Sequence, residues 1–482
     1  PGAANRPGAL IFGTTCNCNT RWLETYKKAF SPRFGFAWSP TALKNNTVFR
    51  GGVGIFYGPL QYTDSGAQTI NGYAATPAFF NTDNFSPGFS LDRGFPAYPD
   101  PPTTDPSYVN GQSPYWLLPG SGRPSSTYNW SFQVQQKLAS NLVGTVGYVA
   151  QSSTHLRSNL LNPNNISPAN FNLGDALNAP IGSALAQQNG ITSPYSGFAG
   201  NVAQSLRPFP QYSRINTTVM ENAGHTSYHS LQATAEQRFH AGLSLQASFT
   251  WSKTLTNADS LIPQTNAGVN GNQNPFDLSL DKAISIQDVP LTFVVAWLYE
   301  LPFGRGKLFM NQGIGAAIFG GWQLGGVQRY QSGEPVSFGC ANGIPGWDNC
   351  IRFSRVPGQA MFSQEVIGGT FDPFVNSYYN RAAFVDPNAN RRGGPFTLGN
   401  YPRVSGDARM SPYYNEDFSV IRNFRLPLGE STRVQFKAEF LNAFNRHVFA
   451  SPNTTPTSPT FGLVTNTINS ARNIQFTLRV NF

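Results

Sequence analysis

The four cysteines are the first residues in this chain whose type and spacing are suited to chemistry. They form two close pairs, Cys16 with Cys18 and Cys340 with Cys350, in Gly- and Asn-rich segments that are typical of loops. In an oxidising compartment such pairs predict loop disulfides. A bond between Cys340 and Cys350 closes a short exposed loop. A bond between Cys16 and Cys18 would form a tight, strained ring, so this pair is the less certain disulfide.

No other set of residues has the spacing of a metal site or an active site. We find no nucleophile elbow, no carboxylate pair beside a histidine and no zinc-protease motif. Residues 51–54 are Gly-rich, but they lie in a strand-like segment and lack the Lys-Ser or Lys-Thr of a phosphate loop. The histidines show no ligand spacing with a cysteine: His155, His225, His229, His240 and His447. We therefore expect no enzyme, no cofactor and no metal.

Composition excludes two further classes of function. The net charge is +9, but Lys and Arg are scattered singly, without the basic runs and interleaved aromatic residues of nucleic-acid binding. The longest nearly apolar run, residues 291–299, is shorter than the ~18–20 residues of a helical membrane span. The 47 Gly and 37 Pro residues instead favour many strands joined by turns and loops.

The elements that must position any functional residue are strands, because apolar and polar residues alternate with a period of two. In the last of them, Ile474, Phe476, Leu478, Val480 and Phe482 share one face. The pattern is strong in residues 128–138, 243–252, 289–299, 433–444 and 472–482. It is weaker in residues 33–40, 47–57, 142–151, 227–239, 319–331 and 415–426. These segments predict about eleven strands, and one more within residues 21–30 would make twelve.

The connections between these strands alternate in length along the chain. Short or moderate links lie at residues 41–46, 139–141, 240–241, 302–318 and 427–430. Long links lie at residues 58–125, 152–226, 254–288, 332–414 and 446–471. This order predicts an all-β, antiparallel transmembrane β-barrel with brief periplasmic turns and long extracellular loops. If Phe482 is periplasmic, every long link lies outside, which a soluble sandwich would rarely match.

Several sequence phrases resemble a known family. The final strand is similar to the closing strand of outer-membrane barrels, so Phe476, Leu478, Val480 and Phe482 are expected to form the signal that barrel-assembly machinery reads. Seven phrases, in order along essentially the whole chain, resemble TonB-dependent receptors of the Oar-like type common in Acidobacteria. They are SPRFGFAWSP, VFRGGVGIFYG, YHSLQA, SFTWSK, YELPFGRG, GGWQLGG and FKAEFLNAFN.

The resemblance implies a barrel of about 22 strands with a plugged lumen, of which this chain would be the C-terminal half. Residues 1–482 are then one β-barrel portion, in which we recognise no plug, TonB box or signal peptide. The TonB complex is an expected partner only if a plug lies upstream.

Two groups of polar residues are candidates for contacts inside or above such a barrel. Arg433, Lys437 and Glu439 share the polar face of one strand and predict a lumen network, in which buried charges pair with each other or contact a plug or solute. Tyr413, Tyr414, Trp347 and residues 376–400 lie in long loops that could hold a ligand.

Three functions fit these expectations. The leading hypothesis is the barrel of an outer-membrane TonB-dependent receptor that imports an unidentified solute, with outer-membrane lipid around it. The alternative is a plug-less fragment whose strand edges pair with other copies in an extracellular or cell-surface oligomer, tube or filament. The third is a passive porin.

Overall fold

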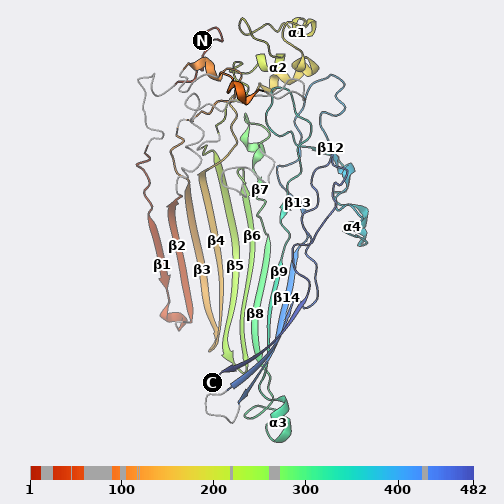
Figure 1. Ribbon diagram of the computed structural model, residues 1–482. Helices are drawn as coiled ribbons and strands as arrows, with labels where there is room; N and C mark the ends of the chain where they lie inside the picture. Colours follow the sequence, from red (N-terminus) through yellow and green to blue (C-terminus); the bar gives the residue numbers. More distant parts are fainter. Residues whose placement is uncertain are drawn as a thin grey trace.

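One large antiparallel sheet dominates the molecule (Figure 1). The computed structural model describes residues 2–11, 25–44, 46–58, 89–97, 105–116, 118, 120–217, 221–259, 272–425 and 433–481. The sheet has twelve strands, and all but β7 follow one path. That path is β1 (Arg33–Trp38), β2 (Thr47–Tyr57), β3 (Ser126–Ala139), β4 (Leu142–Leu156), β5 (Gly224–His240), β6 (Leu243–Thr256), β8 (Leu291–Glu300), β9 (Trp322–Gln331), β14 (Tyr413–Arg425), β15 (Arg433–Leu441) and β16 (Asn473–Asn481).

The register of the strands gives the sheet one apolar and one polar face. Phe132 of β3 lies opposite Gly51 of β2 and Tyr148 of β4, whereas its neighbour Gln133 lies opposite Arg50 and Gly147. Because side chains alternate along a strand, each such row continues across the sheet on its own face. Many apolar-face side chains remain exposed, including Phe476 at 68% and Leu478 at 70%. The sheet therefore presents a broad apolar surface that is not covered by a second layer.

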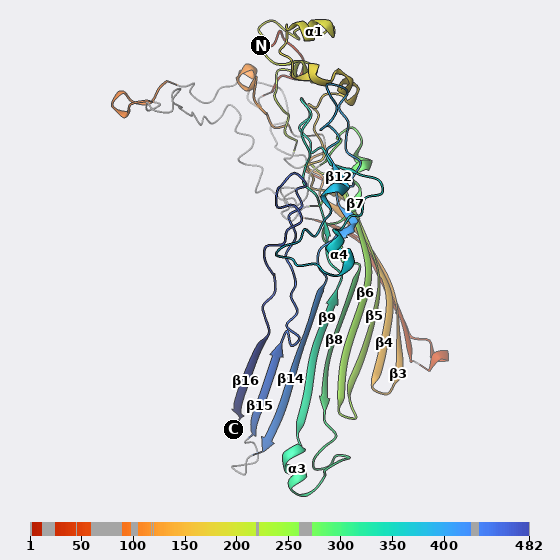
Figure 2. The same cartoon turned by 90° about the vertical axis from the view of Figure 1, so that its right-hand side faces the viewer.

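The sheet is curved but not closed. Figure 2 looks onto its convex side, with the β16 end on the left and the β3 end on the right. Within the described residues β1 pairs only with β2, and β16 pairs only with β15. All eleven strands of the path are antiparallel to their neighbours, so β1 and β16 run in the same direction. The predicted all-β, antiparallel class is confirmed, and the sheet is open at both edges among the described residues.

All eleven predicted segments form strands, and the differences lie at their ends. β15 ends at Leu441 rather than at the predicted Phe444, because Asn442 has a positive φ of 49° and its backbone N–H donates to the Asp417 side chain. β9 begins at Trp322, since helix α3 (Gly313–Phe319) takes the start of the predicted segment 319–331. The twelfth strand is β7 (Ala283–Ile284) beside β6, and the described residues 25–30 of the segment proposed for it contain no strand.

The long connections gather at one end of the sheet and the short ones at the other (Figures 1 and 2). We call the described residues of 157–223, 257–290, 332–412 and 442–472 the loop layer. It contains β10 (Pro335–Val336), β11 (Ser354–Arg355), β12 (Phe384–Val385), β13 (Ser405–Arg409), α1 (Ala184–Gln188), α2 (Val202–Ser205) and α4 (Gln364–Gly368). Its 3-10 helices are η4 (Pro168–Asn178), η5 (Leu278–Asp281) and η6 (Arg381–Ala383). Elsewhere lie η1 (Thr41–Leu43), η2 (Leu91–Arg93) and η3 (Pro106–Val109).

Most buried apolar side chains of the described chain lie in this loop layer rather than in the sheet. One cluster gathers around Trp347 and Phe171, and a second around Phe338 and Tyr379. None of the helices in the described part of the chain is long and apolar enough to cross a membrane. The loop layer is thus a folded unit with its own cores, positioned over one end of the curved sheet.

Candidate functional site

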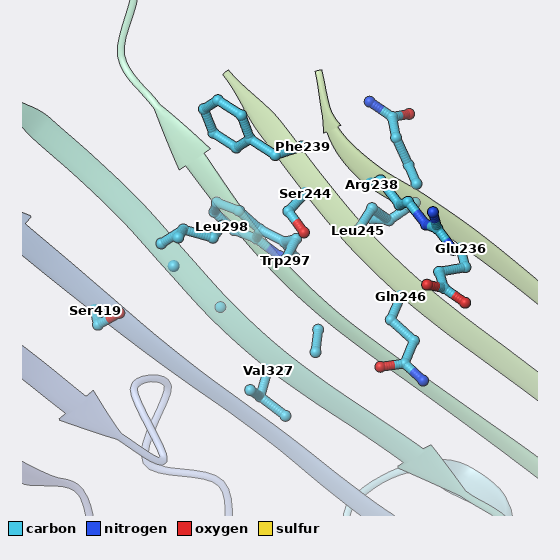
Figure 3. A pocket seen from close by; sticks show the side chains of 14 residues that line it. Glu236, Arg238, Phe239, Ser244, Leu245, Gln246, Trp297, Leu298, Val327 and Ser419 are labelled. Carbon is cyan, nitrogen blue, oxygen red and sulfur yellow. The ribbon is translucent and has the colours of Figure 1, made fainter. Parts of the chain in front are cut away.

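The polar face of the sheet contains a hollow near the end opposite the loop layer. Its volume is about 620 Å³, and its wall is built by five neighbouring strands, β5, β6, β8, β9 and β14 (Figure 3). Glu236, Arg238, Gln246 and Ser419 supply polar groups, and most lining residues come from the polar rows. Ala296, Leu298 and Val327 also line it, so the hollow combines polar groups with an apolar lining and has room for a small solute.

Two glycines of β9, Gly325 and Gly326, leave space for neighbouring side chains on the two faces of the sheet at the hollow. A Cβ on Gly325 would lie 2.6 Å from the Ser419 hydroxyl on the polar face, so any larger residue would narrow the hollow. A Cβ on Gly326 would lie 2.7 Å from the Trp297 indole on the apolar face. The indole N–H of Trp297 donates to Gln328 Oε1 at 3.0 Å. The two glycines therefore set the depth of the hollow and the packing behind it.

The predicted polar network of β15 is only partly assembled. Lys437 Nζ lies 2.7 Å from Glu439 Oε1, so these two side chains form an ion pair on the polar face. Arg433 lies on the same face at an exposed position, and within the described residues no ion pair joins it to the other two. A lumen role for the three residues stays a prediction.

Ion pairs, two of them buried on both sides, join separate segments of the loop layer. Arg403 Nη1 lies 3.0 Å from Asp259 Oδ2, and both side chains are buried. Arg207 pairs with Asp348 at 2.9 Å, and Arg352 pairs with Asp281. Arg409 also pairs with Asp288, at 2.8 Å. Because the partners come from different connections, these contacts fix the loops to one another. Nothing in the local sequence pattern indicates such distant pairs.

Glu221 is a buried carboxylate that holds one segment of the loop layer in place. Its oxygens accept hydrogen bonds from the Ser158 and Thr217 hydroxyls at 2.7 and 2.9 Å and from the Leu160 N–H at 2.5 Å. These bonds lower the pKa of Glu221, but burial, the largest effect, raises it above its ordinary 4.5. The folded state therefore binds this proton more tightly than the unfolded state does.

The free energy of opening this segment is expected to fall as the pH rises through the raised pKa of Glu221, by about 1.4 kcal/mol for each tenfold difference in proton affinity between the folded and unfolded states. Glu221→Gln should remove this pH dependence at the Leu160 amide, which hydrogen exchange between pH 4 and 8 would report. Burial also raises the pKa of Asp281, which this variant leaves unchanged. The pH dependence of exchange near Asp281 therefore serves as an internal comparison. If protection of the wild-type Leu160 amide did not change with pH, or increased as the pH rose, the expected role of Glu221 would be contradicted.

The structure joins Cys340 and Cys350 by a disulfide. The loop it closes is not the exposed loop that we expected, because Ile344 and Trp347 within it are buried in the first core. The Trp347 indole N–H donates to the Gln273 carbonyl at 2.9 Å, so this residue is structural and does not face a ligand. Cys16 and Cys18 lie outside the described residues.

Replacing both Cys340 and Cys350 with serine is expected to destabilise the loop layer by about 2–4 kcal/mol, since the cross-link restrains its unfolded chain. Limited proteolysis with and without reductant would measure the loss, with cleavage expected near Trp347. Reductant should have no further effect on the serine variant. Equal protease resistance of the wild type and the variant would show that the disulfide adds nothing.

Other site residues predicted from the sequence are separated in space. Tyr414 packs near Tyr330 at the loop-layer end of the apolar face, while Tyr413 lies on the opposite face below the Arg329 guanidinium. Residues 376–400 run through both loop cores rather than forming one binding surface. No group of three or more His, Cys, Asp or Glu side chains placed to hold a metal occurs among the residues that the structure describes.

The family follows from a match over nearly the full chain. The sequence model of the family described as "Outer membrane beta barrel domain" matches residues 1–475. The chain belongs to this family. As an outer-membrane barrel protein it places its apolar face against lipid and its polar, concave face toward the lumen. The loop layer is then extracellular, and the short turns are periplasmic.

Several solved structures are similar to this chain over most of its length. They include the outer membrane transporter YddB from Escherichia coli, at 13% identity and a TM-score of 0.42, covering 93% of this chain and 40% of that one. The ferripyoverdine receptor of Pseudomonas aeruginosa has 8% identity and a TM-score of 0.36, covering 92% and 32%. The siderophore receptor PiuA from Acinetobacter baumannii has 8% identity and a TM-score of 0.38, covering 93% and 35%. The chain thus spans two-fifths or less of these proteins. No curated protein sequence matches it.

Proposed function

We propose that this chain is the barrel portion of a TonB-dependent outer-membrane receptor that imports a hydrophilic solute through its lumen. The observation that carries the proposal is the concave lumen wall with its hollow of about 620 Å³ beneath a folded extracellular loop layer. The wall supplies a hydrated path, and the loop layer supplies a folded surface above it. The role is binding and passage rather than catalysis.

The proposal requires pairing partners for the two edge strands of the sheet, β1 and β16. An unpaired sheet edge in hydrocarbon leaves backbone N–H and C=O groups without partners, at several kcal/mol for each group. β1 and β16 run in the same direction, so they cannot close on each other as an antiparallel pair. We infer, as the family resemblance implies, that residues 1–482 contribute one portion of a larger barrel whose other strands pair with β1 and β16. The TonB complex is the expected partner of a plug in that protein, and the Oar-like type is the proposed subgroup.

The assembly signal belongs to the same proposal. Phe476, Leu478 and Val480 are exposed in one apolar row of β16, where folding machinery could contact them before the barrel closes. Phe482 lies outside the described residues.

A matched pair of variants in β14 tests passage through the lumen. Ser419→Trp fills the hollow, whereas Phe418→Trp changes the neighbouring residue on the lipid face. Culture medium would be compared by mass spectrometry for a deletion strain and for strains carrying the wild type or either variant of the full-length protein. We expect the wild-type and Phe418→Trp strains to remove one solute from the medium. The deletion strain and the Ser419→Trp strain should leave that solute in the medium.

A strain without TonB separates the active receptor from a passive porin, because a porin needs no energy input and would still take up the solute. Identical media from all strains would refute transport by this protein.

The open edges also support a second candidate, in which copies of the chain pair edge to edge in a cell-surface oligomer, tube or filament. Cross-linking between cysteines placed on β1 and β16 of differently tagged copies tests it. Links between the two tags support the assembly, and links only within one copy or to upstream strands exclude it.

A further inference from the structure

The loop layer carries a projecting hairpin, residues 362–379, which we call the α4 finger. Phe362 and Tyr379 form an antiparallel bridge at its base, where their rings also stack. The Ser363 N–H donates to the Tyr378 carbonyl at 3.2 Å. Tyr379 belongs to the second loop core and is almost fully buried. The base of the finger is therefore fixed to the folded loop layer.

Local hydrogen bonds also fix the outer part of the finger. The Ser363 hydroxyl caps α4 by accepting from the Val366 N–H, and Gly369, which follows the helix, has the left-handed conformation. Beyond it, Asp372 Oδ1 accepts from the Phe374 N–H at 2.9 Å, and the Asn376 N–H donates to the Asp372 carbonyl at 2.8 Å. These hydrogen bonds define a turn, so the backbone at the tip has a fixed local conformation.

The outer part of the finger exposes large apolar side chains. Phe374 and Val375 are each 72% exposed, and Ile367 is 58% exposed. Phe371, in contrast, packs edge-on against Tyr378 within the finger. The finger therefore buries some of its apolar side chains and leaves others exposed. Large apolar side chains exposed close together in sequence on a folded unit favour a contact surface.

The position of the finger indicates which contact this is. Figure 1 shows α4 to the side of β14, on the outer side of the curved sheet, and Figure 2 shows it just beyond the extracellular ends of β9 and β14. Contacts agree with this placement. Arg446 pairs with Glu416 at 2.8 Å, and Glu416 lies in the apolar-face row that includes Phe418. Phe461 of the same connection packs on Tyr379. The finger thus stands on the lipid side of the barrel.

We propose that the α4 finger is a membrane anchor that inserts Ile367, Phe374 and Val375 into the outer leaflet beside the barrel. Apolar side chains on a polar framework lie stably at the boundary between head groups and acyl chains. The finger continues the lipid-facing apolar band of the sheet outward by one short element. Inserted there, it ties the 332–412 connection, and through its ion pairs the 157–223 and 257–290 connections, to the membrane surface.

Spin labels in the full-length natural protein in outer-membrane vesicles test the proposal. One label is placed at exposed Thr370 of the finger and a control label at exposed Gln188 of α1, at the far end of the loop layer (Figure 1). Both proteins carry Cys16→Ser and Cys18→Ser, and Cys340 and Cys350 are protected by their disulfide. Electron paramagnetic resonance then compares collisions with oxygen, which enters lipid, and with a water-soluble nickel complex.

We expect the ratio of oxygen to nickel accessibility to be about tenfold higher at Thr370 than at Gln188. The double variant Phe374→Asp/Val375→Asp should bring the Thr370 ratio down to the Gln188 value while the barrel stays folded. Equal ratios at the two sites would overturn the anchor. Low accessibility to both reagents at Thr370, with spin–spin broadening that grows with protein density, would also overturn it and assign the finger to contact between copies.

Discussion

Replacing Arg403 with methionine is expected to destabilise the extracellular loop layer by about 3–5 kcal/mol, because it leaves a buried carboxylate without its counter-charge. The Arg403 guanidinium donates to Asp259 Oδ2 and to the Asp281 carbonyl at 3.0 Å, and to the Thr256 carbonyl at 2.8 Å. One side chain therefore joins β13's segment to two parts of the 257–290 connection. Hydrogen exchange at the Ile286 amide, which donates to Asp259, would measure the loss.

A second substitution separates lost charge pairing from lost packing. Asp259→Asn in the Arg403→Met background removes the unpaired charge and keeps an oxygen that can accept from Ser285 or Ile286. This double variant should recover at least about half of the loss, since most of the penalty comes from the isolated buried charge. A single variant that costs less than about 1 kcal/mol, as expected of an exposed pair, would contradict the structural role of this contact.

The second large effect is expected in the middle of β3. Phe132→Arg places a charge on the lipid face and should cost about 2–4 kcal/mol, because such a residue is poorly solvated near the bilayer midplane. Gln133→Arg places the same residue one position along, on the lumen face beside Gly147, and should cost little. Urea unfolding of the full-length protein in lipid vesicles would compare the two. Similar losses for both variants, or a larger loss for Gln133→Arg, would show that the two faces are wrongly assigned.

The strands could be predicted from the sequence because one face of each strand contacts lipid and the other contacts water. Lipid on one side and water on the other select alternating residues, and this signal is local, as in Tyr128, Asn129, Trp130 and Ser131. The lengths of the connections then indicate the orientation, since β-hairpin turns and extracellular loops differ in size. The ends of strands are harder to predict, because a single backbone conformation such as that of Asn442 decides where β15 stops.

The loop layer could not be predicted in the same way. Arg403 and Asp259 are 144 residues apart, and neither stands out among the scattered charges of its segment. Trp347 is a candidate for ligand contact on the sequence alone because loops are usually polar and exposed, but these loops fold around cores of their own and bury it. The 14 residues of the hollow come from five strands, so only the sheet register brings them together. The cysteine spacing at 340 and 350 is the one local signal of this layer.

The most direct test of the lipid and lumen faces is a labelling scan along β3 in the full-length protein in outer-membrane vesicles. Single cysteines at positions 128–135 would be probed with a spin label for collisions with oxygen and with a water-soluble nickel complex. We predict strict alternation, with even positions such as Phe132 accessible to oxygen and odd positions such as Gln133 accessible to nickel. Accessibility without a period of two, or the same alternation with the faces exchanged, would contradict the assignment of a lipid face and a water-filled lumen.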